Sequence, residues 1–438
     1  MVCPKVPMLL EFLATTMGAM RNLATASVLC LIASGCGYLA VPEQQRQLDA
    51  SCEVSGRVET SRGKPSPVVV ILGRRSADGK WRIADHFVRD SAGDYAFVAP
   101  AGHYRVTAFE DLNDDLAYQA GEPFVVTNRD GFPCDAGAHL RVDLMVPENS
   151  GGNLERDVDV ASLQTRSFEG QLDATLGQLT LVGKIAKLDD ARFSQENAEN
   201  GQWRPFDFIV ASYAGIYFLD PPDPKKIPVL FVHGLAGTPA KFDYYISRLD
   251  RSRFQPWIYY YPSGLHLPKI ADHLAQTIAK LQRRYDHPKL VVIAHSMGGL
   301  VSRGFIQRHA AIGTHGEIPL FITISTPWGG HAAAESGVKR SPIVVHVWED
   351  MAPGSEYLAE IFATPLPAKT AHHLLFTFNR NSLSLGASDD QAVTVASELR
   401  PEAQAGATRL YGFDDTHTGV FRNAEVSDLI NKLLDGVR

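Results

Sequence analysis

The feature that most constrains the fold is a series of nearly continuous apolar segments that begins at Ile227. The segments "IPVLFV", "KLVVIAH" and "IPLFITIST" show no alternation of polar and apolar residues, and "LPKIADHLAQTIAKLQRRY" carries apolar residues at helical spacing. Strands without alternation are typical of a parallel sheet that is buried on both faces, and parallel strands need crossover connections, usually helices. We therefore predict an α/β architecture, with helices on both faces of a mostly parallel sheet.

The strand "KLVVIAH" is followed by a serine that the apolar pattern does not explain. Ser296 lies between Ala294 and Gly298, where the strand meets the next helix. A serine nucleophile on a sharp strand-to-helix turn needs small residues two positions before and after it, because the strained backbone leaves no room for larger ones. A serine in this place can also be an ordinary helix cap. Alanine replaces the first glycine of the G-x-S-x-G pattern, and it is still small.

Further motifs surround this serine. "VHGLAG" precedes it, and "ISTPWGG", "DMAPGS", "SDDQAVTVAS" and "THTGV" follow it. Together with "AHSMGG", these motifs make residues 227–435 resemble the α/β-hydrolase family, specifically its bacterial lipase and esterase branch and the related inositol-deacylase-like proteins. The resemblance implies a serine hydrolase that cleaves carboxylic esters through an acyl-enzyme and requires no cofactor.

The resemblance also implies a catalytic triad. Ser296 would be the nucleophile, Asp390 the acid and His417 the general base, in the chain order that this fold uses. Asp389 stays an alternative for the acid, because Gln391 stands where the family usually has a glycine directly after the acid.

Two backbone amides would complete the predicted site. The oxyanion hole is expected to use the N–H groups of Leu235 and Met297, and His233 and Gly234 would shape the loop that carries the first of them. Residues 331–368, which are rich in alanine, glycine and proline, are a candidate lid over the site.

The N-terminus predicts export. Residues 1–36 end in the uncharged stretch "NLATASVLCLIASGC", which is too short to span a bilayer and fits the apolar part of a signal peptide. Its last residues, "ASGC", resemble a bacterial lipobox, so Cys36 is the predicted lipidation site, with ordinary secretion as the alternative. Met20 is a candidate start of translation. We expect an exported, membrane-anchored bacterial lipoprotein in the periplasm or at the cell surface.

Residues 51–147 predict a separate all-β domain. Short apolar runs alternate there with Gly, Pro, Asn and Asp, which favours a small antiparallel sandwich. The segment resembles the transthyretin-like or carboxypeptidase-regulatory-like modules of surface proteins. Residues 37–50 are predicted to be a tether and 148–160 a polar linker. The hydrolase domain would then span 161–438, with its core in 205–438.

Two features of the β domain predict further bonds. Cys52 and Cys134 are expected to form a disulfide, because export exposes them to an oxidising compartment. In addition, four oxygen-bearing side chains have a spacing that suits a Ca²⁺ site, although an acidic hairpin loop with solvated carboxylates is the alternative. These residues are Asp111, Asn113, Asp115 and Glu122.

Charge excludes one class of partner. A formal net charge of −7 over 438 residues, without long basic runs, argues against nucleic-acid binding. The expected substrate is an ester or an acyl-lipid. The same triad would also serve a thioesterase, an amidase or a lipid deacylase. A different alternative is a cell-envelope binding or scaffold protein, in which the sandwich holds an envelope partner and the hydrolase unit is secondary.

Overall fold

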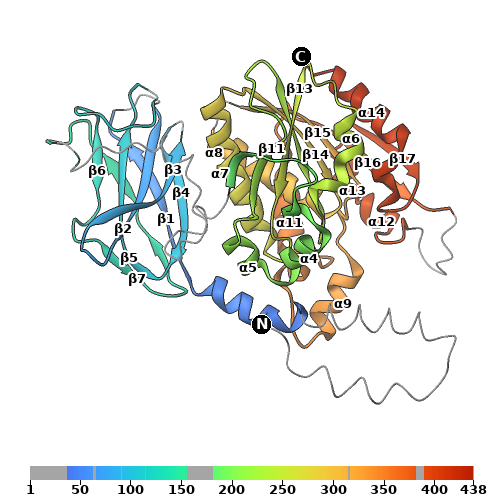
Figure 1. The fold of residues 1–438 in the computed structure, drawn as a ribbon, viewed down its shortest axis with the longest axis horizontal. Coiled ribbons are helices and arrows are strands. Elements are labelled where there is room, and N and C mark those ends of the chain that lie inside the picture. Colours follow the sequence, from blue (N-terminus) through green and yellow to red (C-terminus); the bar gives the residue numbers. More distant parts are fainter. Residues whose placement is uncertain are drawn as a thin grey trace.

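The computed structural model of the chain, shown in Figure 1, describes most of the residues that follow Cys36. The predicted signal peptide, the lipidation site and the candidate start at Met20 lie outside the described residues and stay predictions. Within the described part, no helix combines the length and the apolar character that crossing a membrane requires. The described residues are 37–62, 66–89, 91–113, 115–152, 154, 181–313, 316–380 and 389–437.

Strands β1 to β9 form two sheets that enclose a common apolar core (Figure 1). In one sheet β4, β8 and β9 pair with β1, and in the other the order is β3-β2-β5-β6, with β7 beside β5. β8 and β9 run parallel to β1, which the alternating pattern alone cannot distinguish from an antiparallel pairing. The strands are β1 (Ser51–Thr60), β2 (Val68–Arg75), β3 (Trp81–Arg89), β4 (Gly93–Pro100), β5 (Gly102–Glu110), β6 (Phe124–Val126), β7 (Phe132–Cys134), β8 (His139–Arg141) and β9 (Leu144–Val146).

For this sandwich the sequence predicted a disulfide, which the structure contains, and a Ca²⁺ site, which it does not test. A disulfide joins Cys52 of β1 to Cys134 of β7, the pair expected from the sequence, and it links the two sheets. In the acidic loop, the Asp111 carboxylate accepts the N–H of Leu116 at 2.8 Å, and the Glu122 carboxylate accepts that of Leu112 at 2.8 Å. These hydrogen bonds fold the loop back on itself, and Ca²⁺ binding there stays a prediction.

The second region is built on one large sheet with the order β10-β11-β13-β12-β14-β15-β16-β17. Every neighbouring pair is parallel except β11 and β13. The strands are β10 (Leu181–Ile185), β11 (Gly215–Phe218), β12 (Ile227–Val232), β13 (Phe254–Tyr260), β14 (Lys289–His295), β15 (Glu317–Ile324), β16 (Ala371–Phe378) and β17 (Arg409–Asp414).

Helices cover both faces of this sheet, which confirms the predicted α/β architecture. Leu274 of α7 and Leu300 of α8 belong to the apolar core on one face, and Ile246 of α6 and Ile430 of α14 belong to the core on the other. The helices are α4 (Gln195–Trp203), α5 (Pro205–Val210), α6 (Asp243–Ser247), α7 (Leu267–Tyr285), α8 (Met297–Ile312), α9 (Ala332–Arg340), α10 (His346–Met351), α11 (Glu356–Ala363), α12 (Val395–Glu398), α13 (Pro401–Ala405) and α14 (Ala424–Asp435).

Two boundaries differ from the sequence prediction. The hydrolase sheet begins at β10, before the core predicted for 205–438, because the short strand Leu181–Ile185 pairs with β11. The predicted tether 37–50 is a helix over residues 37–49, the blue helix in Figure 1. Its Val41 is 2% exposed and joins the core of the hydrolase region. A segment that buries apolar residues in this way is a docked helix and not a free tether.

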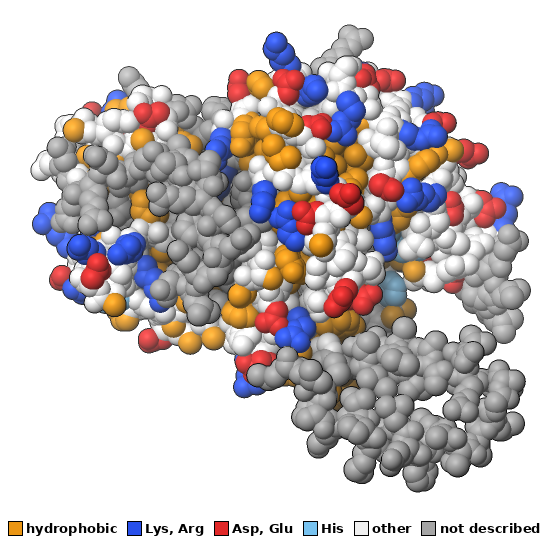
Figure 2. All heavy atoms as spheres, in the orientation of Figure 1, with side chains coloured by type: hydrophobic (Ala, Val, Ile, Leu, Met, Phe, Trp, Pro, Cys, Tyr) orange, Lys and Arg blue, Asp and Glu red, His pale blue; other side chains and the backbone are white. Residues whose placement is uncertain are grey.

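The sandwich also contacts the hydrolase region directly. Lys280 of α7 donates a hydrogen bond to the carbonyl of His86 in β3 at 2.7 Å, and Arg89 of the same strand donates to the carbonyl of Ile312 at 3.0 Å. Figure 2 shows that positive and negative side chains are interspersed over the face in view, without a continuous basic patch among its described residues.

Candidate active site

Ser296 has a backbone conformation that residues other than glycine rarely adopt. Its φ is 54° and its ψ is −132°, at the turn between β14 and α8. The Ser296 N–H donates to the carbonyl of Ile324 in β15 at 2.8 Å, and the Ser296 carbonyl accepts the N–H of Gly299 at 2.9 Å. Such strain costs about 1–3 kcal/mol and persists only where surrounding bonds enforce it. These hydrogen bonds therefore hold the serine at the carboxyl end of β14.

Two glycines allow α8 to approach the sheet behind the serine. A Cβ atom on Gly298 would lie 2.5 Å from the carbonyl oxygen of Val232 in β12, and one on Gly299 would lie 2.1 Å from Oγ1 of Thr326. Both distances are shorter than any tolerated contact of a side chain. The small residues that the sequence places after the serine are thus required by close packing.

The loop after β12 lies directly against the serine. A Cβ atom on Gly234 would lie 2.8 Å from the Ser296 Cβ, so a larger residue would press on the serine side chain. Among the described residues, neither the Leu235 N–H nor the Met297 N–H donates to an acceptor within the protein. Two backbone donors without acceptors at such a turn have the form that an oxyanion hole requires.

His233 fixes the peptide group that carries one of these donors. Its Nδ1 donates to the carbonyl of Gly234 at 2.8 Å, and its Nε2 accepts the N–H of Tyr261 at 3.3 Å. Burial lowers the pKa of His233 to about 4, so the ring is neutral at pH 7. The carbonyl and the following N–H of a trans peptide point in opposite directions. The hydrogen bond to Gly234 therefore also sets the direction of the Leu235 N–H.

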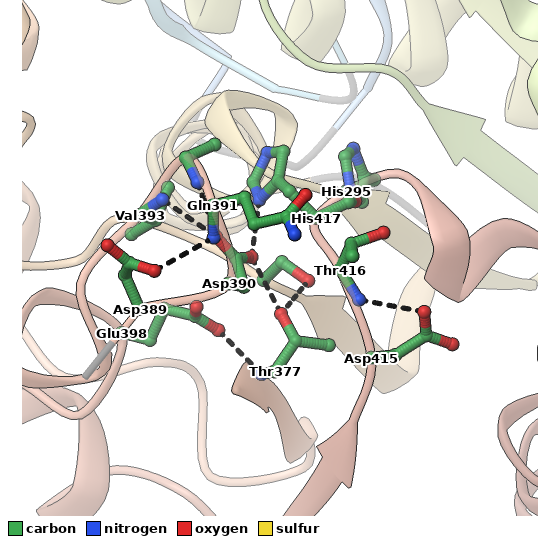
Figure 3. Close-up of polar contacts among 12 residues, drawn as sticks. His295, Thr377, Asp389, Asp390, Gln391, Val393, Glu398, Asp415, Thr416 and His417 are labelled. Atoms are coloured by element: carbon green, nitrogen blue, oxygen red, sulfur yellow. Dashed lines mark hydrogen bonds and ion pairs between the residues drawn. The ribbon is translucent and has the colours of Figure 1, made fainter. Parts of the chain in front are cut away.

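Figure 3 shows a histidine and a carboxylate that meet from two different loops. Nδ1 of His417, in the turn after β17, lies 2.6 Å from Oδ2 of Asp390, in the loop after β16. The His417 N–H also donates to the Asp390 carbonyl at 2.8 Å. The carboxylate of Asp389 instead accepts the N–H of Gln391 at 3.1 Å. Of the two acids that the sequence leaves open, the structure brings Asp390 to the histidine.

The Asp390 carboxylate is buried and hydrogen-bonded on both oxygens. Oδ1 accepts the N–H groups of Ala392 at 3.0 Å and Val393 at 2.7 Å, and Oδ2 accepts the hydroxyl of Thr377 at 2.7 Å. Burial by itself would raise the pKa of Asp390, but His417 and these donors outweigh it and lower the pKa. The carboxylate is therefore held in its ionised form.

Sequence reasoning missed the residues that support this carboxylate. The hydroxyls of Thr377 and Ser325 are 2.7 Å apart, and because Thr377 donates to Asp390, it accepts from Ser325. The Thr377 N–H donates to Glu398 at 3.0 Å. Glu398 is fully buried, and its burial and the charge of Asp390 raise its pKa well above the ordinary value. Thr377 lies near the end of β16, and no motif of the sequence pointed to these roles.

His295 packs beside His417 and is not placed as a base. The two ring centroids are 4.7 Å apart, and Nε2 of His295 donates to the His417 carbonyl at 2.8 Å. Burial, together with the charge of His417, lowers the pKa of His295 well below the ordinary value. The Ser296 hydroxyl makes no hydrogen bond to another described residue. Catalytic hydrogen bonds often tighten only when substrate is bound.

The candidate lid, residues 331–368, consists of two unlike parts. Helix α11 belongs to the core, because the hydroxyl of Tyr357 donates to the carbonyl of Leu300 at 3.0 Å and Ile361 is fully buried. In α9, by contrast, Ala334 is the one buried residue. A depression of about 320 Å³ lies between the start of α9 and the loop that carries Asp390. The segment α9–α10 is here called the cap; its α9 is peripheral, whereas α10 buries Val347 and Met351 in the core.

The family model described as a PGAP1-like alpha/beta domain matches residues 262–350, a range that contains Ser296 but neither Asp390 nor His417. No curated protein sequence matches the chain significantly.

Three of the solved structures that resemble this chain are two lipases and a phospholipase. The mature Bacillus licheniformis lipase BlEst2 is 17% identical, with a TM-score of 0.40 over 50% of this chain and 97% of that one. Aspergillus fumigatus lipase B is 16% identical, with a TM-score of 0.38 over 49% of this chain and 53% of that one. Legionella pneumophila phospholipase PlaB is 16% identical, with a TM-score of 0.32 over 40% and 45%. With TM-scores below 0.5, the roles of individual residues rest on the geometry of this chain.

Proposed function

We propose that the chain is a serine hydrolase that cleaves carboxylic esters, with Ser296 as nucleophile, His417 as general base and Asp390 as the acid. The observation that carries the proposal is the hydrogen bond from His417 to a buried carboxylate, in a turn that contacts His295, the residue directly before a serine on a strained strand-to-helix turn. A serine hydroxyl is a weak nucleophile at neutral pH, and it needs an oriented base to become reactive.

The reaction would run in two acyl-transfer steps. Ser296 Oγ attacks the ester carbonyl carbon while Nε2 of His417 takes its proton. The oxyanion accepts hydrogen bonds from the N–H groups of Leu235 and Met297, and collapse of the intermediate expels the alcohol, which His417 protonates. A water molecule activated by His417 then releases the acid and regenerates the serine.

Asp390 would serve the histidine in two ways. Its Oδ2 accepts the Nδ1 proton, which leaves Nε2 as the free nitrogen that faces the nucleophile during proton transfer. Its negative charge also stabilises the imidazolium that forms when His417 takes the serine proton. The N–H groups of Ala392 and Val393 keep the carboxylate in place during this cycle.

An acyl-lipid at a membrane surface is the substrate class that we favour. Cys36, the predicted lipidation site, directly precedes the helix of residues 37–49. Gln45 of that helix donates to the carbonyl of Val344 at 3.0 Å, and the hydroxyl of Tyr38 accepts the N–H of Ile343, also at 3.0 Å. Both contacts fall between α9 and α10. A lipid anchor at residue 36 would therefore keep the cap close to the bilayer.

Covalent labelling tests the nucleophile. A fluorophosphonate should label the wild type and fail to label Ser296→Ala. The matched control is Ser302→Ala, which removes a fully buried serine of the same helix and should leave labelling intact. Labelling that persists in Ser296→Ala would refute the assignment.

Substrate panels separate the alternatives. Esters of graded acyl length distinguish a lipase from an esterase, and matched thioesters and amides test the related acyl-transfer functions. If none of these substrates is hydrolysed while the protein is folded, an envelope binding role gains support. Incorporation of labelled palmitate that is lost in Cys36→Ser tests the anchor separately.

A further inference from the structure

A cluster of metal-ligating side chains lies away from the proposed triad. His266 immediately precedes α7, and His346 and Glu349 lie one turn apart in α10. Nδ1 of His346 is 3.5 Å from Oε2 of Glu349, and Nε2 of His266 is 3.9 Å from the same oxygen. One ligand atom from each of the three residues lies within 4.8 Å of the other two. Within the described part of the chain, this is the one group of three such residues that converges in this way.

These separations are close to those of a metal coordination shell. Zinc binds imidazole nitrogens and carboxylate oxygens at about 2.0–2.2 Å in a tetrahedron, which places ligand atoms roughly 3.3–3.5 Å apart. The rings of His266 and His346 are stacked, with centroids 4.2 Å apart, so one of the two rings must rotate out of the stack for both lone pairs to meet at one ion. Two imidazoles with one carboxylate favour zinc or a similar transition metal, whereas Ca²⁺ and Mg²⁺ prefer oxygen ligands alone.

A carboxylate outside the cluster orients one of the histidines. Oδ2 of Asp350 lies 3.1 Å from Nδ1 of His266 and accepts the N–H of Leu267 at 2.7 Å. The Asp350 side chain is only 12% exposed, so its position is fixed. Histidine ligands of zinc commonly donate their second nitrogen to a carboxylate in this way. The hydrogen bond leaves Nε2 of His266, the nitrogen that faces Glu349, with its lone pair available.

We propose that His266, His346 and Glu349 bind a zinc ion, with a water molecule as the fourth ligand. The three side chains are 32%, 24% and 49% exposed, so an ion can reach them from solvent. The site ties the cap to the start of α7, two elements that are 80 residues apart in sequence at His266 and His346. Because none of its ligands belongs to the proposed triad or the oxyanion hole, we assign the ion the role of holding the cap against α7.

The cap is in turn connected to the loop of the proposed acid. The carbonyl of Met351, at the end of α10, accepts the N–H of His331 at 2.8 Å. Nε2 of His331 donates to the carbonyl of Ala392 at 2.9 Å, two residues after Asp390. A zinc ion that fixes α10 would therefore also restrict the position of the acid loop, through His331.

Metal binding by the purified full chain tests the proposal. The protein is stripped with a chelator and titrated with ZnCl₂ in competition with a chromophoric chelator, and the metal content is measured by mass spectrometry. We expect one zinc ion per chain and a rise in the unfolding temperature on zinc addition. His346→Gln and Glu349→Gln should each weaken zinc binding at least about tenfold and abolish most of the thermal shift.

Two further variants test whether zinc binding depends on this site and on the carboxylate that orients His266. His139→Gln alters an exposed histidine of the sandwich that lies 3.2 Å from Glu53 but has no second histidine, and it should bind zinc like the wild type. Asp350→Asn should weaken binding by about 10–100-fold while the three ligands remain. Glu349 is half exposed, so its variant is expected to fold, and circular dichroism checks this. Failure of the wild type to bind zinc, or equal affinity in Glu349→Gln and the wild type, would overturn the proposal.

Discussion

The region of the proposed triad and the cap are held in place by different kinds of bonds. Around Ser296 and Asp390, backbone groups make most of the hydrogen bonds, and both residues are almost fully buried. The cap, α9–α10, buries Val347 and Met351 in the core, but it reaches the acid loop and the helix of residues 37–49 through the side chains of His331 and Gln45. Backbone bonds within a packed sheet fix positions, whereas side-chain bonds at the surface are easily broken. The edge of the sheet that carries the proposed triad is therefore expected to be fixed, and the cap beside it to be more adjustable.

The largest expected effect comes from the acid. Asp390→Asn should lower kcat for ester hydrolysis by about 10⁴, because an amide favours the wrong tautomer of His417 and cannot stabilise its cation. Asp389→Asn is the matched control, since that carboxylate accepts the N–H of Gln391 while His417 contacts Asp390, and it should lower kcat less than about tenfold. Steady-state kinetics on a soluble ester measure both. If Asp389→Asn is the inactive variant, the acid has been assigned to the wrong residue.

A second, smaller effect should come from the oxyanion loop. His233→Ala removes the hydrogen bond that fixes the Gly234 carbonyl, so the Leu235 N–H loses its direction. Complete loss of one oxyanion donor costs about 10²–10³ in rate, and a misdirected donor should cost about 10–10², in kcat and not in KM.

His287→Ala controls for the loss of a buried histidine. Its ring is 2% exposed, and its Nε2 bonds Gln255, away from the serine loop. An equal fall in kcat in both variants would show that the effect of His233→Ala is a general loss of stability.

The cap should respond more weakly. His331→Ala breaks the hydrogen bond from the cap to the carbonyl of Ala392, and one such bond contributes about 0.5–1.5 kcal/mol. Activity should therefore fall less than about tenfold, and limited proteolysis should cut α9 faster. If kcat falls as far in His331→Ala as in Asp390→Asn, the cap is part of the same fixed region as the proposed triad, and the two regions do not differ in the way described above.

The sequence predicted the parts of the molecule that repeat a local pattern. Buried strands without alternation predicted the parallel sheet, and the helical spacing of apolar residues predicted α7. The small residues around Ser296 predicted its turn. Motif order alone left Asp389 and Asp390 open, because adjacent residues share a motif and only the folded loop separates them. The zinc ligands were missed because His266 and His346 meet through tertiary packing. The helix of residues 37–49 was missed because it gains its stability from docking, which a local pattern does not report.

The smallest effect on activity is expected from Glu398, and it sharpens the comparison between fixed and adjustable regions. Glu398→Gln keeps the shape of a side chain that is fully buried beside Asp390, and it should leave kcat within about twofold near pH 7, because burial and the charge of Asp390 raise the pKa of the native carboxyl and so favour its uncharged form. Its effect should appear in stability. The folded state raises the pKa of this carboxyl, so its contribution to stability is complete below the unfolded pKa of about 4.3 and is lost as the pH rises through the folded pKa.

The variant removes this titration. Denaturant unfolding at about pH 5 and about pH 9 should therefore show a stability gain for Glu398→Gln over the wild type that grows with pH. Glu402→Gln is the control, since that carboxylate is exposed and bonded to Arg400, which lowers its pKa to about 2. If the difference between Glu398→Gln and the wild type does not change with pH, Glu398 is ionised in the folded protein. Asp390 would then face a second negative charge, and the fixed region would itself contain a repulsive pair of carboxylates.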